Sequence, residues 1–142
     1  MKYFLLIYLF TFNAIASLDC KTSGIELYGD LKFTDKQEFN KFPKRWNVNS
    51  DMFDDLYIKN KKNLNIKSYE IKAETLSKTK LIYEEKSKVE ELKDSYQKLS
   101  KARFSKGIIR NLKLLPMKLT LKILNNENEI LCTSTYSLEV IQ

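Results

Sequence analysis

Histidine is absent from this chain of 142 residues. Nucleophilic catalysis by a Ser-His-Asp or Cys-His arrangement needs an imidazole base, so neither arrangement is available here. The two cysteines, Cys20 and Cys132, are the only thiols, and we expect them to be oxidised. Oxidation would remove both a thiolate nucleophile and the sulfur ligands of a zinc site. We therefore predict that the chain is not an enzyme and carries no cofactor or metal.

Glycine and proline are scarce as well, with 3 and 2 residues in the whole chain. There is no internal repeat, no low-complexity tract and no Pro/Gly-rich linker. A chain of this length is one domain by default. We predict a single domain over residues 17–142.

The longest apolar run lies at the N-terminus. A positive charge at Lys2 precedes the almost wholly apolar segment Tyr3–Phe12, and the small residues Ala14 and Ala16 follow. This order is typical of a secretory signal peptide, although a buried core segment is the alternative. The run is about ten residues long, too short to cross a bilayer of about 30 Å. We predict a signal peptide at residues 1–16, a mature chain in the periplasm and no stable insertion in the membrane.

An even number of cysteines in an exported chain predicts a disulfide. A Cys20–Cys132 bridge would close a loop of about 110 residues and constrain the unfolded chain by roughly 4–5 kcal/mol. The alternatives are two unpaired buried thiols or a lipid anchor on Cys20. Asp19 disfavours the anchor, because a lipoprotein signal has a small residue just before its cysteine.

Alternation of apolar and polar residues predicts several strands. The clearest is Met117–Ile123, in which every second residue is apolar. Asn125–Asn128 forms a turn, and Ile130–Tyr136 returns as the partner strand, which places Cys132 in the core sheet. Further strands are predicted at Ile25–Phe33, Leu56–Asn60, Leu64–Ala73 and Thr79–Glu84, with a bulge or break near Ser68.

Two capping boxes predict helices. Thr34 and Gln37 fit the first box, which predicts a short helix over about 35–42 that Pro43 ends. The second box begins at Ser87, and it is followed by an apolar stripe at three- and four-residue spacing, formed by Val89, Leu92, Tyr96 and Leu99. This stripe predicts a principal helix over about 88–106. The expected fold class is α+β, with a mostly antiparallel sheet, one principal helix and one disulfide.

The charge balance is basic, with 25 Lys plus Arg against 18 Asp plus Glu, a formal net charge of +7. The basic residues are spread along the chain and alternate with acidic ones, so no compact patch is evident. We expect no nucleic-acid partner. Weak attraction to an anionic wall polymer, a membrane surface or an acidic protein is the remaining interpretation.

The segment from Lys44 to Asp55 is predicted to be irregular, and it holds the only tryptophan. Trp and Arg are enriched at binding hot spots. A loop with this composition could occupy a cationic or sugar-binding cleft of a partner, although a core tryptophan under a loop is the alternative. The spacing of the aspartates does not match an EF-hand loop. The candidate partner-binding residues are Arg45, Trp46, Asp51, Asp54 and Asp55.

Paired carboxylates could serve glycoside hydrolysis. The adjacent pairs are Asp54–Asp55, Glu84–Glu85 and Glu90–Glu91. Neighbouring side chains point apart on a strand or a helix, so each pair is poorly placed to act together. We interpret them as solvated charges. Two carboxylates distant in sequence could still converge in the fold, which leaves an exported hydrolase open.

As a whole, the chain resembles the periplasmic immunity proteins of bacteriocins, in particular those of the pesticin type. The points of likeness are the signal Met1–Ala16, the mature size, the single pair Cys20 and Cys132, and a lysine- and asparagine-rich composition. The resemblance implies a protein that protects the producing cell by binding a toxin, without turnover. Pesticin-type toxins are muramidases, so the implied partner is a peptidoglycan-degrading bacteriocin.

Two other functions remain open: an exported carboxylate-dependent hydrolase, and a structural or adhesive component of the envelope. The sequence predicts no oligomeric state.

Overall fold

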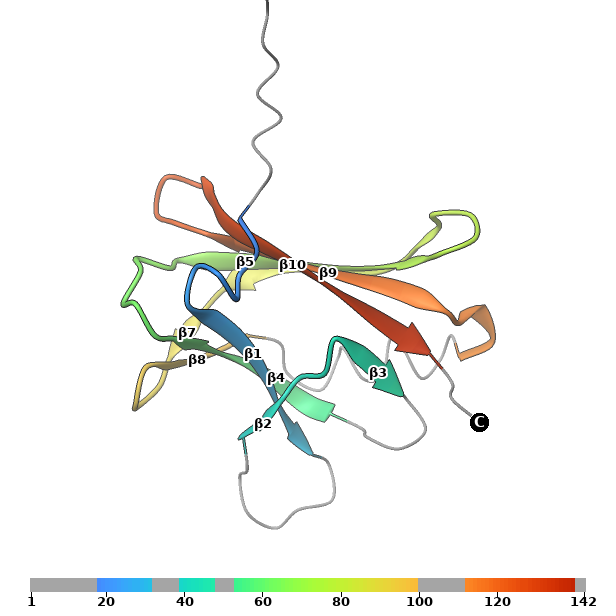
Figure 1. The fold of residues 1–142 in the computed structure, drawn as a ribbon. Helices are drawn as coiled ribbons and strands as arrows, with labels where there is room; N and C mark the ends of the chain where they lie inside the picture. The colour runs from blue at the N-terminus through green and yellow to red at the C-terminus, as the bar shows by residue number, and fades with distance from the viewer. Residues whose placement is uncertain (1–17, 32–38, 48–52, 100–111, 140–142) are drawn as a thin grey trace, which may run out of the picture.

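The computed structural model describes residues 18–31, 39–47, 53–99 and 112–139, and the predicted signal peptide lies outside them. Within these ranges, strands form two five-stranded sheets that face each other as the layers of a sandwich (Figure 1). None of the helical residues described forms a segment that could cross a membrane. The strands are β1 (Ile25–Leu31), β2 (Phe39–Lys41), β3 (Arg45–Asn47), β4 (Phe53–Asn60), β5 (Ser68–Thr75), β6 (Leu81–Lys88), β7 (Glu90–Glu91), β8 (Tyr96–Lys98), β9 (Met117–Leu124) and β10 (Ile130–Glu139).

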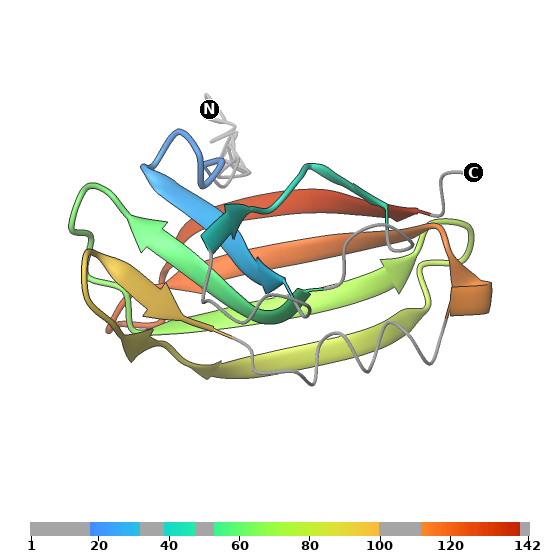
Figure 2. The same ribbon diagram turned by 90° about the horizontal axis from the view of Figure 1, so that it is seen from below.

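Sheet A has the strand order β3-β10-β9-β5-β6, and sheet B has the order β2-β1-β4-β8-β7. Within the described part of the chain the strand pairs are antiparallel, except for the parallel pair of β3 and β10. Seen from below, β1 and β4 of sheet B cross β9 and β10 of sheet A obliquely (Figure 2). The chain moves back and forth between the layers, so each sheet contains strands from both halves of the sequence.

The core lies between the two sheets. Met117, Leu119, Leu121 and Ile123 of β9 are at most 1% exposed, while the residues between them face outward. On β5 the same alternation buries Tyr69, Ile71 and Ala73, and sheet B contributes Ile25, Leu27, Leu56 and Ile58. Each buried side chain of this size stabilises the fold by about 1.5–3 kcal/mol.

The predicted C-terminal hairpin is confirmed. Antiparallel pairing joins β9 and β10, and Asn125–Asn128 forms the connection, in which the Asn125 side chain accepts hydrogen bonds from two backbone N–H groups. The predicted break near Ser68 is also found. Leu64–Lys67 is irregular, and β5 begins at Ser68 because the chain leaves sheet B and enters sheet A there.

The predicted α+β class is wrong, because the described residues form an all-β sandwich. Helix among them is confined to one 3-10 turn, η1 (Leu112–Leu114). The principal helix predicted over 88–106 is absent from its described part, where the chain instead forms the end of β6 and the hairpin β7–β8; residues 100–106 lie outside the described ranges.

The hairpin explains why this helix does not form. Glu90 and Glu91 pair with Lys98 and Gln97, and the Leu92 N–H donates to the Tyr96 carbonyl. Asp94 and Ser95 adopt left-handed φ values of 60° and 65°, which a right-handed helix cannot contain. Asp and Ser are common turn residues, so the same segment satisfies β-hairpin chemistry.

The short helix predicted over 35–42 is also wrong where the structure describes it. Phe39–Lys41 forms β2, which pairs with β1. The Phe42 N–H then donates to the Leu27 carbonyl, and the Phe42 side chain is buried. Pairing with β1 and burial of Phe42 outweigh the local capping signal. Residues 35–38 lie outside the described ranges.

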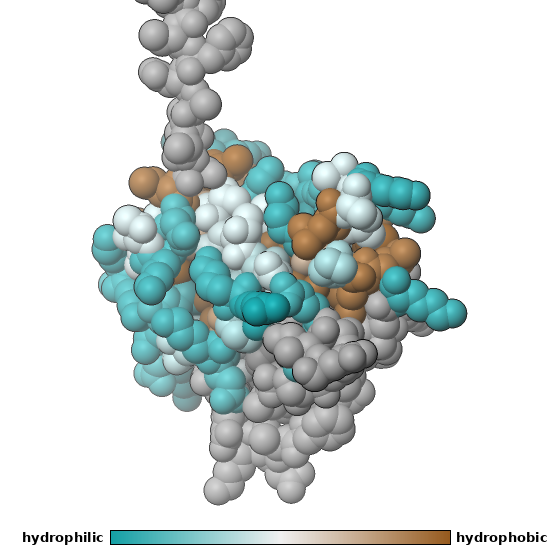
Figure 3. Space-filling model, turned by 45° about the vertical axis from the view of Figure 1, so that its right-hand side comes forward, coloured by the Kyte–Doolittle hydropathy of each residue, from teal (hydrophilic) through white to brown (hydrophobic). Residues whose placement is uncertain are grey.

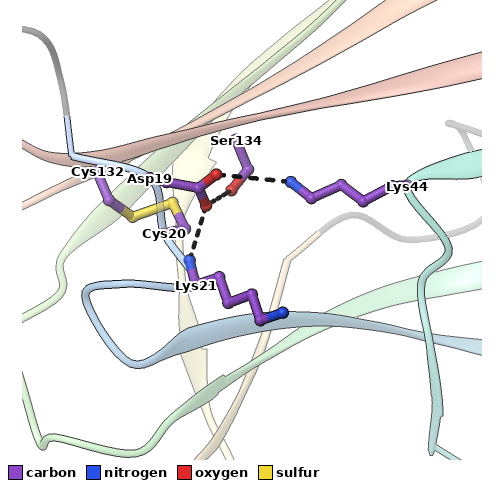
Figure 4. The surroundings of a disulfide bond; sticks show 6 residues. All are labelled: Asp19, Cys20, Lys21, Lys44, Cys132 and Ser134. Atoms are coloured by element: carbon purple, nitrogen blue, oxygen red, sulfur yellow. Dashed lines mark hydrogen bonds and ion pairs between the residues drawn. A yellow bond between two sulfur atoms is a disulfide. The ribbon is translucent and has the colours of Figure 1, made fainter.

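The predicted disulfide is confirmed. Cys20 and Cys132 are bonded, with their Cα atoms 4.8 Å apart, and both are buried (Figure 4). Asp19 forms a parallel β-bridge with Thr133, and the Asp19 carboxylate accepts hydrogen bonds from the Lys21 N–H and the Ser134 hydroxyl. These contacts hold the start of the described chain against β10 of sheet A.

Candidate binding surface

The candidate residues from the sequence divide between the two sheets. Arg45 lies on β3 of sheet A, where its Nε is 2.6 Å from Glu139 Oε2. The backbone of Trp46 pairs with Leu138 in the parallel register of β3 and β10, while its side chain lies outside what the structure describes. The segment predicted to be irregular therefore contains one strand and the beginning of another.

The aspartates of the same prediction belong to sheet B or lie outside the description. Asp51 is not among the described residues, and Asp54 is described only as backbone of β4. Asp55 lies on β4, with its Oδ2 3.0 Å from Lys98 Nζ. Of the candidate set, Asp55 alone has a described side chain in sheet B, and its neighbours define a surface that the sequence did not reveal.

That surface is the outward side of sheet B, opposite the core. In the register of β1, β4 and β8, Tyr28, Tyr57 and Lys98 lie directly beside one another, with Tyr57 only 1% exposed. In the neighbouring row on the same side of the sheet, Glu26, Lys59 and Tyr96 lie beside one another. We call the whole set the tyrosine–lysine face: Glu26, Tyr28, Asp55, Tyr57, Lys59, Tyr96 and Lys98.

Aromatic rings and ammonium groups alternate on this face. The rings of Tyr28 and Tyr96 pack edge to face with centroids 5.6 Å apart. The Lys59 ammonium lies 5.1 Å from the centre of the Tyr96 ring, and the Lys98 ammonium lies 5.6 Å from that of Tyr57. Such cation–π contacts contribute about 0.5–1 kcal/mol each at exposed sites. They fix the lysine side chains in defined positions before any partner binds.

Carboxylates complete the face. Asp55 accepts hydrogen bonds from Lys98 and from the Tyr57 hydroxyl, the latter at 3.3 Å. Glu26 accepts from the Tyr28 hydroxyl at 2.8 Å and from Lys61 at 2.8 Å. Each carboxylate therefore contacts a tyrosine hydroxyl and at least one lysine, which restricts the rotamers of these side chains.

These contacts shift the pKa values of the groups involved. Hydrogen bonds from Lys61 and then Tyr28 hold the pKa of Glu26 below its usual value. Burial, followed by the bond to Glu26, raises the pKa of Tyr28 to about 12. Burial opposes the charge on Lys98, but the bond to Asp55 leaves the pKa of Lys98 raised. These shifts favour a charged Glu26, a charged Lys98 and a neutral Tyr28 at neutral pH.

The tyrosines are the residues that sequence reasoning missed. Glu26 and Tyr28 are two residues apart, as are Tyr57 and Lys59, and Tyr96 and Lys98. This spacing puts both members of a pair on one side of a strand. The signal was thus present, but Tyr96 had been assigned to the apolar stripe of a helix.

A second exposed feature lies at one end of sheet A. Leu76, Leu81 and Leu114 are 52%, 48% and 38% exposed. The Leu76 N–H donates to the Pro116 carbonyl at 3.3 Å, so the turn between β5 and β6 lies beside the residues that precede β9. In Figure 3, hydrophobic atoms are exposed among hydrophilic ones on this side of the molecule. Grouped apolar side chains of this kind are a common feature of protein contact surfaces.

The adjacent carboxylate pairs point apart where the structure describes both members. Glu84 lies near Lys86 and Lys72 on the outer side of sheet A, whereas Glu85 accepts hydrogen bonds from Tyr69 and Tyr83 on the inner side. On β7, Glu90 is opposite Lys98 and Glu91 is opposite Gln97. Within the described ranges, no three acidic or cysteine side chains gather as a metal site would require.

Comparison with known proteins adds no relative. No protein-family model matches the chain, and no curated protein matches it significantly.

Proposed function

We propose that the exported chain is an inhibitor of the immunity type, which binds and neutralises a peptidoglycan-degrading, muramidase-type bacteriocin in the periplasm. The whole-chain resemblance to pesticin-type immunity proteins supports this proposal. So does the Cys20–Cys132 disulfide, which is consistent with an oxidising compartment such as the periplasm. On this proposal the protein acts by forming a stoichiometric complex, and it neither makes nor breaks bonds.

The observation that carries the proposal is the tyrosine–lysine face. Tyrosine offers a large, rigid contact area with a polar end, and it is enriched in protein interfaces. Tyr28 and Tyr96 are partly exposed on this face and are held by their mutual ring contact and by the bond of Tyr28 to Glu26, whereas Tyr57 is buried and cannot itself contact a partner. Side chains held in place before binding lose less conformational entropy in the complex.

The charge of the whole chain also fits the proposed partner. Glycoside hydrolases of the muramidase kind use a pair of carboxylates in their active-site cleft. The chain has a net charge of +7. On the face, Lys59 places its ammonium beside the Tyr96 ring, whereas Lys98 is paired with Asp55. Complementary charge of this kind accelerates association and selects the partner.

The proposal is tested with the purified oxidised chain and a pesticin-type muramidase. We expect inhibition of peptidoglycan hydrolysis that is complete at a 1:1 ratio, in agreement with a complex seen by size-exclusion chromatography. Lys59→Ala should weaken inhibition about tenfold, as expected for loss of a charged contact. Lys118→Ala is the matched control, because Lys118 is an exposed lysine on the outer side of sheet A.

Two further variants compare this face with the residues predicted from the sequence. Trp46→Ala changes sheet A, whereas Asp55→Asn changes the tyrosine–lysine face. A loss of inhibition confined to Trp46→Ala would move the interface to β3. Absence of both inhibition and complex, or turnover of any substrate by the chain itself, would overturn the proposed function.

A further inference from the structure

A polar pocket of about 230 Å³ lies at one end of the sandwich. It forms where the crossover from β4 to β5 meets the hairpin of β7 and β8. Its polar residues are Asn60, Asn63, Asn65, Glu91, Ser95 and Gln97. Asn60 and Gln97 belong to the inward side of sheet B, so polar side chains replace the apolar core at this end.

The buried amide of Gln97 has an unmet acceptor. The residue is 4% exposed, and its Nε2 donates to Glu91 Oε1 at 2.8 Å. Its Oε1 has no hydrogen-bond partner among the described residues. The NH₂ group of the amide faces the Glu91 carboxylate, so Oε1 is the end of the amide without a partner. A ligand at this position has to supply an N–H or O–H donor.

The neighbouring amide of Asn60 differs from that of Gln97, because both of its ends have hydrogen-bond partners. The Asn60 Nδ2 donates to the Leu64 carbonyl at 2.7 Å, and its Oδ1 accepts from the Leu64 N–H at 2.9 Å. Both ends of this amide are therefore used, and they hold the crossover in place. Asn60 therefore fixes the pocket wall, whereas the Oε1 of Gln97 can still accept a hydrogen bond from a ligand.

The charge of the lining selects the kind of donor. Among the described residues that line the pocket, Glu91 is the titratable one, and none is a lysine or arginine. Leu64 and Ile66 supply an aliphatic part of the wall. A carboxylate beside an unmet amide oxygen favours a cationic donor, because hydrogen bonds to charged groups are stronger than neutral ones.

We propose that this pocket binds a cationic amine, an ammonium group on an aliphatic stem, with Gln97 Oε1 and the Glu91 carboxylate as its acceptors. The stem lies against Leu64 and Ile66. The ammonium comes either from a small free amine or from a lysine side chain of a partner protein. This site is separate from the tyrosine–lysine face, because Gln97 faces inward on β8 while Tyr96 and Lys98 face outward.

The test is an NMR titration of the ¹⁵N-labelled oxidised chain with n-butylammonium chloride. We expect saturable shifts of the Gln97 side-chain amide and of the backbone at Asn63, Asn65 and Glu91. n-Butanol, which has the same stem without the charge, and potassium chloride at equal ionic strength should produce no saturable shift. Shifts that are equal for n-butanol, or that leave the Gln97 amide unmoved, would overturn the proposal.

Two variants with the same charge change make the test specific. Glu91→Gln should weaken butylammonium binding about tenfold. Glu90→Gln should leave binding unchanged, because Glu90 is the neighbouring residue on β7 but does not line the pocket. An equal effect of both variants would show general charge attraction and overturn the site. Since the muramidase assay is independent, failure here leaves the proposed function standing.

A third ligand distinguishes the source of the amine. Nα-acetyl-lysine methylamide carries the same ammonium on a blocked backbone, as a partner protein would. Saturable shifts at the same residues would support a partner lysine as the occupant. Binding of butylammonium without binding of the blocked lysine would support a small free amine.

Discussion

The Cα atoms of Cys20 and Cys132 lie 4.8 Å apart, although 112 positions separate them in the sequence. The bond joins the beginning of the described chain to a strand that pairs with β3 on one side and β9 on the other. A covalent link over so long a loop restricts the unfolded chain more than the folded one.

We expect the double variant C20A/C132A to lose about 4 kcal/mol of unfolding free energy, as loop-closure entropy predicts for a loop of this length. Urea unfolding followed by tyrosine and tryptophan fluorescence measures the loss. Thiol reduction of the wild type should produce the same change and should leave the double variant unaffected. Equal stability of oxidised and reduced wild type would contradict the prediction.

Glu26 should make stability depend on acidic pH. Its folded-state pKa lies below the usual value of 4.5 because Lys61 and Tyr28 donate to the carboxylate. The stabilisation is therefore present above the unfolded-state pKa and disappears as the pH falls through the folded-state pKa. Glu26→Gln should lower the free energy of unfolding by about 1 kcal/mol at pH 7.

At a pH below the folded-state pKa of Glu26, the wild type and E26Q should unfold at nearly the same urea concentration. Glu127→Gln is the matched control, because Glu127 is an exposed glutamate of the turn between β9 and β10. A difference between wild type and E26Q that stays constant from pH 7 to pH 3 would show that the carboxylate charge does not matter.

Glu85 should stabilise the fold through its hydrogen bonds on the inner side of sheet A. The hydroxyls of Tyr69 and Tyr83 both donate to its carboxylate, with the Tyr69 contact at 2.6 Å. Tyr69 is buried, and burial followed by the bond to Glu85 raises the pKa of its hydroxyl. Glu85→Ala should cost about 2–3 kcal/mol, because it removes the acceptor of a buried hydroxyl.

Tyr69→Phe provides the control for this mechanism. In the E85A background it removes the hydroxyl that has lost its acceptor, so it should recover part of the lost stability. A double-mutant cycle from urea unfolding gives the coupling energy between the two side chains. Additive effects of E85A and Y69F on the free energy of unfolding would show that the two side chains do not stabilise the fold through their hydrogen bond.

A side chain at position 24 should lower the free energy of unfolding. Its φ of +75° lies in the left-handed region, and an added Cβ would lie 2.8 Å from Lys62 Cγ. Gly24→Ala should therefore cost about 1–2 kcal/mol. The double variant G24A/K62A removes the clash but leaves the backbone strain, so it should remain less stable than K62A. If G24A/K62A were as stable as K62A, the clash with Lys62 alone would explain the lost stability, and the prediction of backbone strain would be wrong.

The sequence predicted the strands with a buried and an exposed side, but it did not predict that there are two sheets. The alternating pattern of Met117–Ile123 predicts a strand by itself, because every second side chain is apolar and buried in the core. By contrast, β8 pairs with the distant strand β4, whereas a helix was predicted from four apolar residues at helical spacing: Val89, Leu92, Tyr96 and Leu99. Such pairing is non-local and leaves no periodic mark in the segment itself.

The candidate site was predicted in part. Asp55 lies on the tyrosine–lysine face, but Arg45 belongs to the other sheet. Residues close in sequence were taken to be close in space, whereas the chain changes sheets between β3 and β4. The pocket at Gln97 depends on two separate segments, 60–66 and 91–97, and neither segment alone contains a signal for it.

The position of β10 in sheet A has a consequence for biosynthesis. Synthesis proceeds from the N-terminus, so Cys20 is made long before the strand that holds its partner thiol. Until β10 is in place, β3 lacks its described neighbour and sheet A is incomplete. A truncated chain that ends before Ile130 would leave Cys20 without its partner thiol and would expose the unpaired edge of β9, and an exposed strand edge promotes pairing with other chains.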